Sequence, residues 1–188
     1  MSRLSNAYQY RVICEDKQME IFARRFLENQ GIDVCRKVYF DIAPNKECGE
    51  AYVKRNLPKH MQEIRSMNYN RIAVIAFTDA DTETVEDRRN RLLDELSEKG
   101  IAFDKSKDLM FALIPKRNIE TWIVYFEDEN ANIGEDKDYG HLRNPATCKP
   151  MAIKMSEKLK RGELSHNRLS SLAFAQKEYD RVCAIQNK

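Results

Sequence analysis

Two hydrophobic patterns alternate along the first 126 residues: short continuous apolar runs, and apolar stripes at the spacing of a helix. The clearest run, Arg71–Phe77, has the length and continuity of a strand that is buried on both faces. The predicted strands are 10–14, 34–40, 71–77 and 109–114. The predicted helices are 19–27, 50–67, 85–96 and 119–126, with a break in the second helix near Pro58.

Strands that alternate with helices predict a parallel sheet with right-handed crossovers. We therefore expect an α/β fold over residues 8–126: a Rossmann-like parallel sheet of about four strands flanked by helices. Residues 127–140 are acidic and rich in loop-forming residues, and this segment is called the acidic loop below. Two further helices, near 147–160 and 170–185, complete residues 127–188. We expect this helical C-terminal extension to pack on the flank of the sheet or to form a small lid.

The bulk composition predicts a globular protein located in the cytoplasm. The chain has 188 residues, of which 42% are hydrophobic and 33% are charged. No segment reaches the roughly 18 apolar residues that a membrane span needs, and the first ten residues lack the apolar core of a secretory signal. The five cysteines are widely spread and form no CxxC pair, so we expect free thiols rather than a zinc or redox site.

Charge is distributed unevenly, although the formal net charge is only +2. Glu127–Asp138 holds six acidic residues and one lysine, whereas Thr147–Lys188 holds nine Lys or Arg and four Asp or Glu. A basic C-terminal third is suited to phosphate backbones. The same composition is also that of solvated faces on two surface helices. The sequence leaves both interpretations open.

Three carboxylates follow predicted strands. Glu15 comes directly after the first strand, and Asp79 and Asp81 follow the third. Because ligands of open parallel sheets bind beyond the carboxyl ends of the strands, we expect these side chains to meet. Clustered oxygen ligands suit Mg²⁺ or Mn²⁺. The alternatives are that an aspartate caps the next helix and that Glu15 interacts only with a helix dipole.

A second group of candidates opens the fourth predicted helix. Lys116 and Arg117 stand just after the fourth strand, where cations could hold a phosphate. Glu120 lies one turn further and is a candidate metal ligand. The alternatives are an ordinary charged first turn for the two cations and a solvated side chain for Glu120. Trp122 is predicted to lie in the core.

These motifs resemble the Toprim domain, which occurs in topoisomerases, primases and small nucleases of the overcoming-lysogenization-defect type. Val12–Glu20 resembles the first Toprim motif, and Ile75–Asp81 resembles the second. Ile114–Trp122 is similar to a stretch in small Toprim-like proteins that are often tied to phage defence. The resemblance covers roughly residues 8–126. Toprim proteins usually have glycine after the first-motif glutamate, where this chain has Asp16, so Asp16 is either a departure or an additional acidic ligand.

The resemblance implies a Mg²⁺-dependent nuclease that hydrolyses phosphodiester bonds of DNA or RNA, in phage defence and with a partner protein in some systems. Glu15, Asp79 and Asp81 would be the catalytic residues, and the same three with Glu120 would hold Mg²⁺ or Mn²⁺. The candidate residues for binding phosphate or nucleic acid are Lys17, Lys116 and Arg117. A topoisomerase would need a tyrosine nucleophile, and a primase would need zinc and helicase-binding regions, neither of which the sequence indicates.

Other functions share parts of this pattern. The site could serve a non-catalytic sensor that binds metal and nucleotide, or a subunit of a defence complex. An Mn²⁺-dependent nucleotide-sugar transferase also uses Asp-x-Asp, but it usually needs a longer chain and a nucleotide-binding strand pair that we do not find. A phosphatase of the haloacid-dehalogenase type expects threonine or valine where Glu83 stands.

Overall fold

The computed structural model describes residues 3–44, 47–67, 71–140 and 142–188. Its centre is a parallel sheet of four strands in the order β2-β1-β3-β4. The strands are β1 (Gln9–Cys14), β2 (Val38–Ile42), β3 (Ile72–Phe77) and β4 (Met110–Leu113). The middle strand β1 pairs with β2 on one side and with β3 on the other. The predicted α/β class and all-parallel sheet are therefore confirmed.

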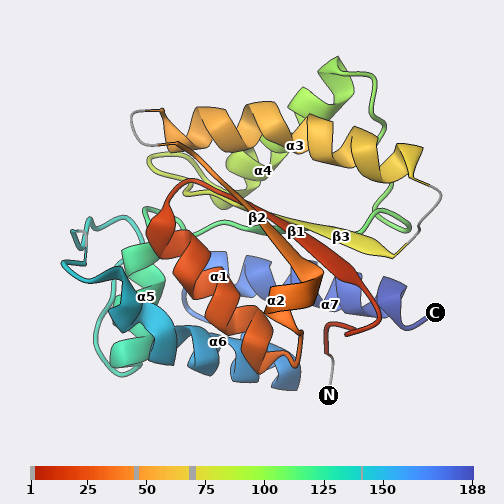
Figure 1. Ribbon diagram of the computed structural model, residues 1–188. Helices are drawn as coiled ribbons and strands as arrows, with labels where there is room; N and C mark the ends of the chain where they lie inside the picture. The colour runs from red at the N-terminus through yellow and green to blue at the C-terminus, as the bar shows by residue number, and fades with distance from the viewer. Residues whose placement is uncertain (1–2, 45–46, 68–70, 141) are drawn as a thin grey trace.

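Helices cover both faces of the sheet (Figure 1). One face carries α3 (Gly49–Ser66) and α4 (Val85–Glu98). The other face carries α1 (Lys17–Asn29), α5 (Ile119–Glu127), α6 (Lys149–Arg161) and α7 (Ser170–Gln186). Two short elements complete the chain, the single-turn helix α2 (Val34–Lys37) and the 3₁₀ helix η1 (Pro145–Cys148).

The larger hydrophobic core lies on the α1 face and includes side chains from both C-terminal helices. The rings of Phe22, Phe77 and Trp122 pack together at its centre, with centroids 6.0–6.5 Å apart. The indole N–H of Trp122 donates to the Ser171 hydroxyl at 2.8 Å, which ties α5 to α7. Trp122 is buried as predicted, and the C-terminal helices pack as a layer of the fold.

The prediction for residues 34–40 was wrong in part. Residues 34–37 form the single-turn helix α2, and β2 starts only at Val38. The carbonyl of Asp33 accepts hydrogen bonds from the backbone N–H groups of Arg36 and Lys37, which closes this turn. The spacing of the apolar residues in this short segment fits a turn as well as a strand, so the pattern alone did not distinguish them.

The predicted break at Pro58 was also wrong, because α3 runs through this residue. A proline inside a helix lacks the N–H that would bond to the preceding turn. Here the flanking residues Val53, Leu57 and Met61 are buried against the sheet, and this packing holds the helix continuous.

Several basic residues of the C-terminal third are bound within the fold. Lys154 donates to the carbonyl of Phe126 at 2.6 Å, and Lys158 pairs with Glu129 at 2.9 Å. Lys160 donates to the Asn29 carbonyl at 2.8 Å. These lysines connect α6 to α1 and to the end of α5. Part of the positive charge of the C-terminal third therefore stabilises the fold. Within the described segments, we find no helix with both the length and the apolar character needed to cross a membrane.

Candidate functional site

The strand order places the topological switch point of the sheet between β1 and β3. The chain leaves β1 for β2 on one side and later returns to β3 on the other, so the connections diverge between β1 and β3. In open parallel sheets, ligands bind outside the carboxyl ends of the strands at such a point. Glu15 follows β1 directly, and Thr78 and Asp79 follow β3. The predicted meeting of Glu15 and Asp79 therefore occurs where this topology favours a binding site.

Glu15 faces β3. Its Oε1 accepts hydrogen bonds from the Thr78 hydroxyl and from the backbone N–H of Asp79, the latter at 3.0 Å. Burial raises the pKa of the Glu15 carboxyl above its usual range, and these two hydrogen bonds only partly offset that effect. Glu15 is thus a half-buried carboxyl that is aimed at the end of the neighbouring strand.

The first turn of α3 packs closely against Glu15. A Cβ added at Gly49 would lie 2.5 Å from the Cβ of Glu15 and 3.0 Å from its Cα, which is too close for any side chain. Position 16, where Toprim proteins usually have glycine, is instead a helix cap: Asp16 Oδ1 accepts from the backbone N–H of Met19 at 2.8 Å. The close backbone approach at Glu15 is therefore made by Gly49, and Asp16 is occupied as the N-cap of α1.

Asp79 carries the least satisfied carboxylate of the site. Its Oδ1 is buried and has no hydrogen-bond partner among the described residues. Burial raises the pKa of Asp79 well above its usual range, and the negative charges of Glu15, Asp16, Asp81 and Glu120 raise it further. Such an oxygen favours a proton or a bound cation.

Asp81 pairs with an arginine of α4. It has a left-handed backbone with φ of 54°, and its carboxylate lies 3.4 Å from the guanidinium of the buried Arg88. Arg88 also pairs with Glu50 and lies 3.7 Å from Glu83. The N-cap of α4 is Thr84, whose hydroxyl accepts from the Asp87 N–H at 3.0 Å. The alternative that Asp79 or Asp81 caps this helix is therefore wrong.

Glu120 lies inside the fold. It is only 1% exposed, and its Oε1 accepts from the Gln18 side-chain amide at 3.0 Å. This contact joins the start of α5 to α1, and the charge of Glu120 is one of those that raise the pKa of Asp79. The alternative of a solvated Glu120 is therefore wrong. Its predicted role as a metal ligand stays a prediction.

The three candidate phosphate-binding residues differ in their surroundings. Lys17 is exposed at the start of α1 and pairs with Glu20. Lys116 donates to the carbonyl of Glu83 at 2.7 Å and pairs with Asp136 of the acidic loop at 3.0 Å. Arg117 is half-buried beside it, after β4. Lys116 is thus held near the site by its own chain.

The predicted metal ligands do not converge as a set. Across the described residues, no group of three or more His, Cys, Asp or Glu side chains is arranged to hold a metal ion. Glu15 and Asp79 are brought together, whereas the Asp81 carboxylate is drawn to Arg88.

Sequence reasoning missed Gly49, Thr78 and Arg88. Arg88 falls on the same helical stripe as Val85 and Leu92, and an arginine within an apolar stripe was a detectable signal of a buried cation. Thr78 stands beside a predicted site residue and could have been included with it. Nothing in the local sequence marks Gly49, because its contact with Glu15 depends on how α3 enters the fold.

Comparison of the chain with protein-family models, with curated proteins and with solved structures gave no match.

Proposed function

We propose that this protein is a Toprim-type phosphodiesterase that hydrolyses DNA or RNA with Mg²⁺ or Mn²⁺. One observation carries the proposal: the Oδ1 of Asp79 is buried without a hydrogen-bond partner among the described residues. Asp79 also donates its backbone N–H to Glu15 at the divergence point of the parallel sheet. A raised pKa at such a position is typical of functional carboxylates.

The residues present fit a divalent cation in part. Asp79 has an available carboxylate oxygen in an environment that several negative charges make favourable to a cation. Glu15 is the adjacent carboxylate. For Asp81 to share the cation, its side chain must leave Arg88, and Asp81 is sufficiently exposed to do so. The bound metal would supply polarisation of the scissile phosphate and activation of water.

The other residues have roles that follow from their positions. Glu15 is suited to move a proton, because burial raises its pKa above the usual range and two hydrogen bonds to Oε1 fix the direction of the side chain. Lys116 and Arg117, which follow β4, are suited to hold the non-reacting phosphate oxygens. Arg88 pairs with Asp81 and Glu50, and it holds Asp81 until that side chain moves to the cation.

The test is cleavage of labelled plasmid, single-stranded DNA and RNA in Mg²⁺, Mn²⁺ or EDTA. Asp79→Asn and Glu15→Gln keep the size of each side chain and remove its charge. We expect each variant to lose metal-dependent cleavage by at least about a hundredfold. Asp94→Asn is the matched control, because Asp94 is exposed on α4. Cleavage that survives in both site variants would contradict the proposal.

A second candidate is a metal- or nucleotide-binding subunit that acts only with a partner protein. Two contacts favour it: Asp81 is held by Arg88, and Lys116 is held by Asp136. Metal binding without cleavage by the purified, folded chain would support this candidate over an independent nuclease. The proposed place in phage defence rests on the Toprim resemblance and applies to both candidates.

A further inference from the structure

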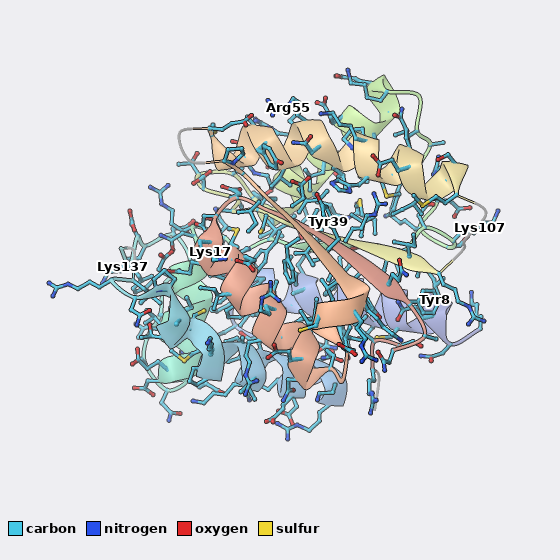
Figure 2. All side chains as sticks on the ribbon, viewed as in Figure 1. Tyr8, Lys17, Tyr39, Arg55, Lys107 and Lys137 are labelled. Atoms are coloured by element: carbon cyan, nitrogen blue, oxygen red, sulfur yellow. The ribbon has the colours of Figure 1, made fainter. Side chains whose placement is uncertain are left out.

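A concave surface lies between the edge strand β2 and helix α3, and neither Glu15 nor Asp79 lines it. It is a cavity of about 510 Å³, which we call the β2–α3 cleft. Its floor is formed by the side chains of β1 and β2 that face α3, among them Arg11, Tyr39 and Asp41. Its wall is the C-terminal half of α3, and α2 contributes to the rim. Figure 2 shows Tyr39 on β2, with α3 and its Arg55 above it in this view.

The interior of the β2–α3 cleft is held by a hydrogen-bonded network. His60 is only 8% exposed, and both of its ring nitrogens have partners. Arg11 can only donate, so His60 Nδ1 accepts from its guanidinium at 3.2 Å. His60 Nε2 therefore carries the proton and donates to Asp41 at 2.7 Å. The Tyr52 hydroxyl also donates to Asp41, which makes this floor rigid.

Tyr39 presents an aromatic ring at the mouth of this network. The residue is 60% exposed, and among the described residues only Met67 is another exposed large hydrophobic residue. The Tyr39 ring lies 6.2 Å from the His60 ring, so the buried histidine supports it from one side. An exposed ring that is fixed from behind is a platform on which a nucleobase can stack.

The charges of the β2–α3 cleft favour an anion at its rim. Four basic side chains and two acidic ones line it. The two acids are engaged within the network, Asp41 with His60 and Glu63 with Arg11. Lys59 donates to the neutral amide oxygen of Asn56 at 2.9 Å. Arg36 pairs with Asp33 at 3.6 Å, but its side chain remains 85% exposed. Lys59 and Arg36 are therefore positioned to meet a phosphate group.

We propose that the β2–α3 cleft binds single-stranded nucleic acid, with a base stacked on Tyr39 and the backbone phosphates held by Lys59 and Arg36. The cleft is connected to the candidate active site through β2. Ile42 pairs with Cys14, which precedes Glu15, and Tyr39 lies three residues earlier, about 10 Å along the strand. That this strand is the substrate rests on the proposed nuclease function, whereas binding at Tyr39 does not.

The test is fluorescence anisotropy with labelled oligothymidylate, oligouridylate and a DNA duplex, in EDTA to prevent cleavage. We expect the single strands to bind more tightly than the duplex. Tyr39→Ala should weaken single-strand binding about tenfold, and Tyr39→Phe should retain it because the π face remains. Lys59→Gln should lower the slope of log affinity against log salt by about 0.7, the value for one phosphate contact on a single strand.

Two variants are matched controls. Met67→Ala removes the other exposed large hydrophobic side chain, and Lys107→Gln removes an exposed cation outside the cleft. Both should bind like the unsubstituted protein. Equal affinity of Tyr39→Ala and the unsubstituted protein would overturn the proposal, as would duplex binding that is as tight as single-strand binding. Competition by free uridine monophosphate at equal nucleotide concentration would also overturn it, in favour of a mononucleotide site.

The two proposals can fail separately. Asp79→Asn should bind the oligonucleotides normally but not cleave them. If cleavage depends on Asp79 but binding does not depend on Tyr39, the nuclease proposal stands and the cleft proposal is wrong. If binding depends on Tyr39 but the protein cleaves nothing, the cleft proposal stands and the nuclease proposal is wrong.

Discussion

The acidic loop and the carboxyl ends of β1 and β3 both concentrate carboxylates, but their surroundings differ. In the loop, Glu135 accepts four hydrogen bonds of 2.5–2.9 Å from the backbone and hydroxyl groups of Ser170 and Ser171, at the start of α7. Asp136 pairs with Lys116. At the sheet, by contrast, the Oδ1 of Asp79 is buried without a hydrogen-bond partner among the described residues.

This difference shows that acidic density in the sequence does not indicate which carboxylates lack donors in the fold. The loop has the more acidic sequence, yet Glu135 and Asp136 help to hold α7 and the β4–α5 turn in place. The sheet end has fewer carboxylates, but their burial raises the pKa values of Glu15 and Asp79. A bound cation would stabilise the charged forms of Glu15 and Asp79. In the loop, Glu135 and Asp136 already have donors.

The largest effect on stability is expected at Arg88, the buried cation beside the sheet-end carboxylates. Arg88→Met would leave Glu50 and Asp81 without the guanidinium that now faces them, and Glu83 would keep only its pair with Arg91 among its ion pairs in the described residues. We expect a loss of about 3–5 kcal/mol in the free energy of unfolding, measured by urea denaturation. Arg91→Met, at an exposed arginine that also pairs with Glu83, should cost less than about 1 kcal/mol. Equal losses would show that burial of Arg88 is unimportant.

Gly49→Ala tests the close approach of α3 to Glu15. Alanine favours helices, so substitution in the first turn should be stabilising unless the new methyl group collides with Glu15. We expect the collision to dominate and to lower the free energy of unfolding by about 1–3 kcal/mol. Gly134→Ala is the control, since an added Cβ there meets nothing within 4 Å. A neutral Gly49→Ala would contradict the packing described at Glu15.

Glu135→Ala tests the structural use of the acidic loop. The substitution removes the acceptor for the first backbone N–H groups of α7, and we expect a loss of about 1–2 kcal/mol in unfolding free energy. Glu127→Ala, at an exposed glutamate that ends α5, should change stability by less than about 0.5 kcal/mol. If both variants unfold alike, the contacts of Glu135 with the start of α7 do not stabilise the fold as proposed.

The smallest effect on stability is expected at Asp136, which is 85% exposed where it pairs with Lys116. Asp136→Asn should change the free energy of unfolding by less than about 1 kcal/mol. The substitution also frees Lys116 for phosphate, so we expect tighter oligonucleotide binding with a steeper salt dependence. Asp104→Asn, which removes an exposed acid near Lys107, is a charge-matched control. Unchanged binding by Asp136→Asn would count against a phosphate-binding role for Lys116.

Much of the fold could be predicted because its apolar pattern is simple. The buried strands β3 and β4 appear as continuous runs, and the stripe through Leu92 and Leu96 indicates a helix. The edge strand β2 was misplaced at its start because one of its faces is polar and half-exposed. In the site, Glu15 and Asp79 could be predicted from strand ends.

Other features of the site depend on distant contacts. The burial of Glu120 involves Gln18, which is 102 residues away in the sequence, and the contact of Gly49 with Glu15 depends on the path of α3. The direction of the Asp81 carboxylate depends on Arg88, seven residues later on α4. A local hydrophobic pattern does not predict contacts between residues that are far apart in the sequence.

The pH dependence of stability follows from the raised pKa of Asp79. The pKa of Asp79 in the folded protein lies above its unfolded value of about 3.9. The contribution of Asp79 to the free energy of unfolding is therefore fully present below about pH 3.9, and it is lost as the pH rises through the folded pKa. At neutral pH, which lies above the unfolded pKa, burial of this carboxyl therefore costs stability. Asp79→Asn should be more stable than the unsubstituted protein by about 1–3 kcal/mol at pH 7, and this advantage should shrink in acid.

The central claim is that Asp79 belongs to a cation-binding site, and thermal unfolding at pH 7 with and without Mg²⁺ tests it most directly. In EDTA, Asp79→Asn should melt at a higher temperature than the unsubstituted protein. Saturating Mg²⁺, at a hundred times its dissociation constant, should stabilise the unsubstituted protein by about 2.7 kcal/mol and leave Asp79→Asn unchanged. A Mg²⁺ effect of equal size in both proteins, or in neither, would contradict the account.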